Sequence, residues 1–125
     1  MKAPQKIAFD FVIEELYSRH PQVKSIFGAH GVYIGNKIIC ILREKDSYQN
    51  DNGIWIASPS ENHESLKTLI PVLRRIEMFG EHAGDWLLIP SENEDFETYA
   101  NTFCGLVLQG DPRIGKVSKA KFLTK

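Results

Sequence analysis

Residues 32–42 read Val-Tyr-Ile-Gly-Asn-Lys-Ile-Ile-Cys-Ile-Leu, two apolar runs on either side of Gly35-Asn36. Glycine and asparagine both tolerate a positive φ, and such a pair between β-branched runs is a strong signal for a tight hairpin. The segment therefore predicts two antiparallel strands, at 32–34 and 38–42, and places an antiparallel sheet in the N-terminal half of the chain.

Further strands are predicted on both sides of this hairpin. Residues 23–27 can form a strand before it, and the alternating segment 53–57 forms one after it. The polar residues 43–52 lack apolar periodicity and predict a long loop between hairpin and strand. With a last short apolar run at 86–90, the sheet is expected to have about four to five strands.

Three helical regions are predicted around the sheet. The first spans residues 3–18, with apolar residues at helical spacing. The second spans 59–77 and contains Pro71, which predicts a kink or a break into two short helices. The third follows Ser91, which has the order of a capping box with Glu94, and it ends at Gly110. Together these elements predict an α+β fold, with the N-terminal helix and two later helical regions packed on the antiparallel sheet.

Composition indicates one globular domain. The chain has 125 residues, of which 42% are hydrophobic and 25% charged, and its formal net charge is −1. No apolar run has the length of a membrane span, and no signal peptide is recognised at the start, so a cytoplasmic protein is expected. The net charge excludes a wholly basic nucleic-acid binder.

The two cysteines predict neither a disulfide nor a redox pair. Cys40 and Cys104 each lie in an apolar run, and the chain has no C-x-x-C spacing. We expect both to be small buried hydrophobic residues.

Residues 111–125 differ from the rest of the chain in charge. They hold five basic residues and one acid, a balance of +4, whereas residues 1–110 have a balance of −5. We therefore expect a single α+β domain over 1–110 and a basic tail over 111–125. Such a tail can bind phosphates or an acidic partner, and the expected contacts are Arg113, Lys116, Lys119 and Lys121. The alternative is a solvated terminus that only aids solubility.

The segment Ile26-Phe27-Gly28-Ala29-His30-Gly31-Val32-Tyr33, followed by Gly35-Asn36-Lys37, resembles the opening of the TfoX N-terminal domain family, which is related in fold to YjbR-like proteins. That family has a Met-Phe-Gly-Gly-Tyr-Gly-Leu-Tyr type of segment after its first helix. The matching residues are Phe27, Gly28, Gly31 and Tyr33, and those that depart are Ile26, Ala29 and His30. Residues 86–90 and the acidic start of the next helix look like the family's closing strand and helix.

The resemblance implies a small α+β domain with an antiparallel sheet packed against helices. It also implies a regulatory role, since the namesake proteins regulate natural competence. It supplies no catalytic residues, because none is established for this domain. The family's regulators carry a second, helical domain, and in this sequence a basic tail stands in its place.

The glycine-containing segment can also be interpreted as a ligand site. Gly28 and Gly31 can let a backbone approach a ligand closely beside Phe27, with His30 as an acid, a base or a metal ligand. A second Phe-Gly-x-His segment at 79–82 repeats the pattern and adds His82, and Trp86 follows. The simpler interpretation is that the glycines shape a tight connection between strands while Phe27 anchors the core.

Signals for catalysis, a metal or a cofactor are weak. The chain has neither a phosphate-binding G-x-G-x-x-G segment nor a G-x-S-x-G turn. A metal site would need His30, His82 and Asp85 to converge, and the histidines show no local ligand spacing. We expect no catalytic residue, no metal and no cofactor.

The sequence thus favours a small, non-enzymatic regulatory or binding module. It would contact a protein or nucleic-acid partner partly through the basic tail, as a monomer or a homodimer. The alternative is a small-molecule-binding protein or minor enzyme with a pocket near His30, His82 and Trp86.

Overall fold

The computed structural model describes residues 6–117, apart from the side chains of residues 82 and 83, and its centre is a six-stranded antiparallel sheet. Five strands are neighbours in the order of the chain: β1 (Gln22–Ile26), β2 (Ala29–Ile34), β3 (Lys37–Arg43), β4 (Gly53–Ala57) and β5 (Trp86–Pro90). The sixth, β6 (Lys116–Val117), pairs with the first residues of β3. The predicted α+β class with an antiparallel sheet is confirmed.

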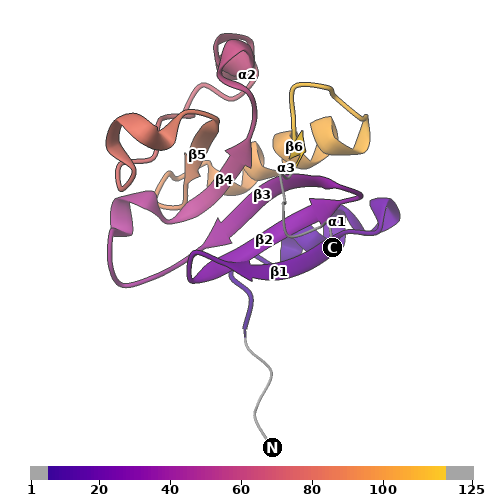
Figure 1. Ribbon diagram of the computed structural model, residues 1–125, viewed down its shortest axis with the longest axis horizontal. Coiled ribbons are helices and arrows are strands. Elements are labelled where there is room, and N and C mark those ends of the chain that lie inside the picture. The colour runs from indigo at the N-terminus through magenta and orange to yellow at the C-terminus, as the bar shows by residue number, and fades with distance from the viewer. Residues whose placement is uncertain (1–5, 118–125) are drawn as a thin grey trace, which may run out of the picture.

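Helices α1 (Phe11–Glu15) and α3 (Phe96–Leu108) pack on the same face of the sheet, behind the strands in Figure 1. Helix α2 (His63–Leu69) follows β4. Four short 3-10 turns complete the order: η1 (Tyr17–Arg19), η2 (Gln49–Asp51), η3 (Ser60–Asn62) and η4 (Gly80–Ala83). Over residues 6–117, no helix is long and apolar enough to cross a membrane.

The sheet has a core on each face. On the inner face, strand residues such as Ile54, Ile56 and Leu87 meet Val12 of α1 and Phe103 of α3, and all five are fully buried. The other face, here called the outer face, carries a second cluster that consists of Ala29, Ile38, Ile41, Trp55, Ala57, Ile76 and Leu88. Side chains alternate between the two faces, except in β3, where a register shift opposite Val32 and Tyr33 leaves both Ile39 and Cys40 in the inner core.

Among residues 6–117, one segment covers one end of the outer face. The segment 70–85 places Ile76 in the second cluster, with Met78 and Phe79 packed against it. Over β1 and β2, the outer face carries the partly buried side chains of Ile26 and Tyr33.

The first two helical regions are shorter than the sequence predicts. The first begins at Phe11, because Phe9 has a φ of +52°, which an α-helix does not allow. The second ends at Leu69, and residues after Pro71 do not resume the helix. Arg74 instead exchanges backbone hydrogen bonds with Leu88 of β5.

The third helix begins later than predicted. It begins at Phe96 with Asp95 at the N-cap position and no side-chain cap, so the predicted cap by Ser91 is wrong. Its predicted end is confirmed. Gly110 has a φ of +74°, and the amides of Gly110 and Asp111 donate to the carbonyls of Val107 (2.9 Å) and Leu106 (3.0 Å).

The predicted boundary at residue 110 does not separate a packed body from a tail. Ile114 is only 4% exposed and belongs to the inner core. The Gly115 amide donates to the carbonyl of Ala57 at 2.7 Å, and β6 follows. The packed part of the chain therefore continues through Val117, and Lys119 and Lys121 lie outside the described residues.

The polar loop over 43–52 is held by internal hydrogen bonds. The buried Arg43 guanidinium donates to the carbonyls of Ser47 (2.9 Å) and Tyr48 (3.0 Å) and to Asn52 Oδ1 (2.8 Å). The side chain of Asn52 also exchanges two hydrogen bonds with the backbone of Lys45. These hydrogen bonds fix the conformation of the loop, as they do in a turn.

Gly53 provides a test of the register between β4 and β5. A Cβ at this position would lie 2.0 Å from the carbonyl oxygen of Ile89, and the φ of +141° is unfavourable for other residues. We expect Gly53→Ala to lower the free energy of unfolding by about 3 kcal/mol or more in urea titrations.

The matched control is Gly105→Ala. Gly105 lies inside α3 with open space around its Cβ position, so alanine should raise the free energy of unfolding by about 1 kcal/mol. Equal effects of the two substitutions would contradict the close approach at Gly53.

The expectation for the cysteines is confirmed, because both are unpaired and buried. Burial is the main cause that raises the pKa of the Cys40 thiol and raises that of Cys104 to about 12. We expect neither thiol to react with a disulfide reagent in the native protein at pH 8, and both to react at once in denaturant. Rapid native labelling of either thiol would contradict this packing.

Candidate functional site

Phe27 and Gly28 form the two-residue turn between β1 and β2. Ile26 pairs with Ala29, and the two turn residues have φ values of +52° and +75°. Gly28 therefore supplies the turn geometry. For an aromatic residue the left-handed conformation is uncommon, and Phe27 is also 60% exposed, so the prediction that Phe27 anchors the core is wrong.

The two Phe-Gly segments meet through their phenylalanines on the outer face. The ring of Phe27 contacts Phe79 at a centroid distance of 5.7 Å, and Phe79 contacts Trp55 at 5.4 Å. Trp55 then contacts Trp86 at 6.2 Å. All three contacts are edge-to-face, so a continuous line of aromatic rings crosses the outer face from the β1–β2 turn to β5.

Gly31 has a packing role on the same face. An added Cβ would lie 3.0 Å from Ile26, 3.1 Å from Tyr33 and 3.4 Å from Ile38, which close over this glycine. His30 alternates with Ala29 and Gly31 and therefore points to the inner face.

The structure does not bring His30 and Trp86 together, because Trp86 packs on the outer face. His82 lies in η4, and its side chain is outside the described part. Among the described residues, no three His, Cys, Asp or Glu side chains gather in a way that could hold a metal ion.

A row of outer-face side chains crosses β1, β2, β3 and β6. Tyr33 is opposite Gln22 on one side and Ile38 on the other, and Ile38 is opposite Lys116. The ammonium group of Lys24 lies 5.0 Å from the centre of the Tyr33 ring, in cation–π geometry. This end of the outer face therefore combines an aromatic ring with two lysines.

The two described basic residues of the predicted tail are held in ion pairs. Arg113 makes two hydrogen bonds to the carboxylate of Asp111, at 2.9 and 2.6 Å, and a third to Ser65 Oγ at 3.1 Å. Lys116 Nζ lies 2.9 Å from Asp85 Oδ2. The hydrogen bond from Lys116 is the main cause that lowers the pKa of Asp85. Arg113 is thus occupied within the fold, whereas Lys116, opposite Ile38 on the outer face, stays about 40% exposed.

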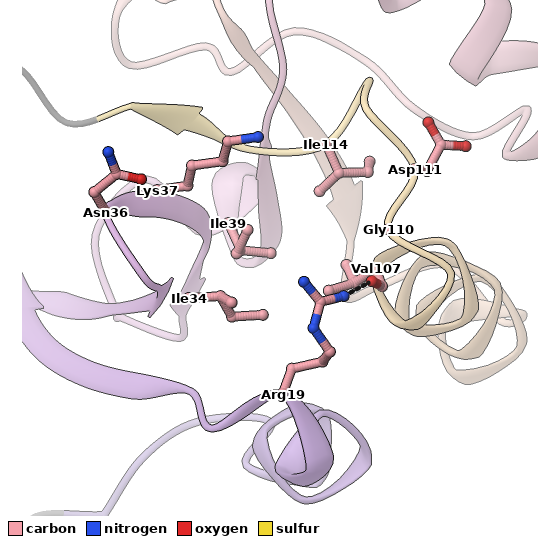
Figure 2. Close-up of a pocket in the computed structure, with 9 residues that line it drawn as sticks. All are labelled: Arg19, Ile34, Asn36, Lys37, Ile39, Val107, Gly110, Asp111 and Ile114. Atoms are coloured by element: carbon pink, nitrogen blue, oxygen red, sulfur yellow. Dashed lines mark hydrogen bonds between the residues drawn. The ribbon is translucent and has the colours of Figure 1, made fainter.

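A cavity of about 240 Å³ lies between the β2–β3 hairpin, the end of α3 and the chain that follows it (Figure 2). Ile34, Ile39 and Ile114 form an apolar wall, Arg19 extends into the cavity, and Lys37 lies at its edge beside β6. No sequence pattern predicts this cavity. Its residues come from three separate parts of the chain, at residue 19, 34–39 and 107–114, and no spacing in the sequence connects them.

Comparisons of the chain with protein-family models, with curated proteins and with solved structures give no match. The resemblance to the TfoX N-terminal domain therefore stays a prediction.

The pair formed by Asp111 and Arg113 has a consequence for stability against pH. The hydrogen bonds from Arg113 lower the pKa of Asp111 in the folded protein. A lowered pKa stabilises the fold above the pKa of the unfolded chain, about 3.9, and this contribution is lost as pH falls through the folded pKa.

We therefore expect Asp111→Asn to lower the urea midpoint at pH 7 and to have a much smaller effect at about pH 2. Asp46→Asn, at an exposed position of the polar loop, is the control and should leave the midpoint unchanged at both values. An effect of Asp111→Asn that is the same at both pH values would contradict the ion pair.

Proposed function

We propose that this protein is a small non-enzymatic binding module, and that its outer sheet face contacts single-stranded nucleic acid. The observation that carries the proposal is the combination of rings and cations on one face. Phe27, Tyr33 and Trp86 are at least partly exposed there. Lys24 lies over the Tyr33 ring, and Lys116 is opposite Ile38 on the same face.

Each of these groups suits an unpaired strand. Nucleic-acid bases stack on exposed aromatic rings with little regard to sequence, and lysines neutralise the phosphates between them. A half-covered antiparallel sheet offers a platform of this kind, because its side chains stand perpendicular to the strands.

Only the lysines of the basic segment after Gly110 are kept as contacts in this proposal. Arg113 is occupied by Asp111, so we assign it to the fold, whereas Lys116 lies on β6 at the edge of the outer face. Lys119 and Lys121 follow β6 in the chain and are proposed as additional phosphate contacts. The regulatory role and the cytoplasmic location expected from the sequence belong to this same proposal.

Overall charge limits the affinity to be expected. The net charge is −1, and the partner of Lys116 is an acid, so the attraction comes from local groups only. We expect weak binding that falls steeply as salt increases.

The test is the fluorescence anisotropy of a labelled oligo(dT) and oligo(U) at low salt, with a duplex of equal length for comparison. We expect the single strands to bind more tightly than the duplex. Tyr33→Ala should weaken binding about tenfold, and Lys24→Gln should lower the salt dependence by about one unit.

Matched controls separate surface contacts from general effects. Tyr17→Ala removes a ring that is 77% exposed on η1, and Lys67→Gln removes a lysine of α2. Both should leave affinity unchanged. A chain that ends at Val117 tests Lys119 and Lys121, because a cut at Gly110 would also remove β6 and the buried Ile114. Absence of binding at low salt, equal binding of the duplex, or an equal loss in Tyr17→Ala would overturn the proposal, and the last result would indicate nonspecific association.

A further inference from the structure

The cavity in Figure 2 is lined on one side by aliphatic carbons and bordered on the other by cations. The wall consists of Ile34 of β2, Ile39 of β3, Val107 of α3 and Ile114. Ile114 and Ile39 are nearly fully buried and belong to the inner core, so the wall is rigid. Its volume of about 240 Å³ is below that of a typical drug-sized pocket and suits a ligand of only a few carbon atoms.

Arg19 is fixed in position by the end of α3. Its Nη1 donates to the carbonyl of Val107 at 2.6 Å, and Figure 2 shows the guanidinium within the cavity beside Ile39 and Val107. This single contact leaves the other guanidinium N–H groups without a protein acceptor among the described residues. A fixed arginine with unused donors is well prepared to bind a planar anion.

The charged groups that a ligand in the cavity would meet are mainly cations. Lys37 lies at the edge of the cavity, and within residues 6–117 no carboxylate lies at salt-bridge distance from Lys37 or Arg19. Asp111 also lines the cavity, but its carboxylate is held by two hydrogen bonds from Arg113. An anion in the cavity would therefore meet two available cations and one acid that is already neutralised.

We propose that this cavity binds a small carboxylate with a short aliphatic body. The carboxylate accepts hydrogen bonds from Arg19 and attraction from Lys37, and the aliphatic body packs on Ile34, Ile39 and Ile114. The carboxylate chemistry follows from the planar guanidinium, and the aliphatic body from the isoleucine wall. This site is separate from the outer face and does not depend on the function proposed above.

The test uses the full chain, labelled with ¹⁵N, and hexanoate as the probe, with amide chemical shifts as the measurement. We expect saturable shifts confined to residue 19 and its neighbours and to residues 34–39 and 107–115. Hexanamide lacks the charge and acetate lacks the aliphatic body, so each should bind at least about tenfold more weakly. Inorganic phosphate, which carries only charge, should also bind more weakly.

Two variants assign the cations. Arg19→Gln should weaken hexanoate binding about tenfold, but it also removes a contact to α3 and can lower stability. Lys37→Gln changes an exposed side chain and should weaken binding several-fold with the fold intact, whereas Lys67→Gln is the control and should bind as the unchanged protein does. Equal affinity for hexanoate and hexanamide, equal affinity for hexanoate and acetate or phosphate, no saturable shift, or no effect of Lys37→Gln would overturn the proposal.

Discussion

The carboxylate of Asp51 is fully buried, and its two oxygens accept hydrogen bonds from the backbone amides of Glu77 (2.9 Å) and Met78 (2.8 Å). The carbonyl of the same residue accepts a hydrogen bond from Trp55 Nε1 at 2.8 Å. Asp51 thus binds both the segment 70–85, which covers one end of the outer face, and the side chain of Trp55 beneath that segment. Because a buried carboxylate without partners is very unfavourable, these hydrogen bonds couple the polar loop to the segment 70–85 and to β4.

This constraint explains why the outer face is divided into two parts. Where Asp51 holds the cover, Trp55 and Leu88 are buried and the second core is complete. Outside the part that this segment covers, the side chain of Tyr33 packs against Gly31, and the ammonium group of Lys24 lies over the Tyr33 ring. Phe27 lies at the margin between the two parts, because its ring contacts Phe79 of the covering segment.

Local signals predicted the sheet well and the helix starts poorly. The Gly35-Asn36 hairpin and the strand at 86–90 follow from residue types within a few positions, and both are present. The start of α3 depends on competition among Ser91, Asp95 and the turn at 91–95, which a capping pattern alone does not resolve. The candidate sites were harder still, because the aromatic line and the cavity join residues far apart in the chain. Neighbouring residues of a strand point to opposite faces, so the position of His30 next to Ala29 places it on the face opposite to Trp86 once Ala29 and Trp86 are known to share the outer face.

The two residues of β6 determine where the described part of the chain ends on the sheet. Their pairing with β3 places Val117 opposite Lys37 and Lys116 opposite Ile38. A group that a short chain links to a binding surface has an effective concentration there on the order of millimolar, whatever the bulk concentration of the protein. The weak contact proposed for the sheet and the weak contacts proposed for Lys119 and Lys121 would therefore reinforce each other on the same ligand.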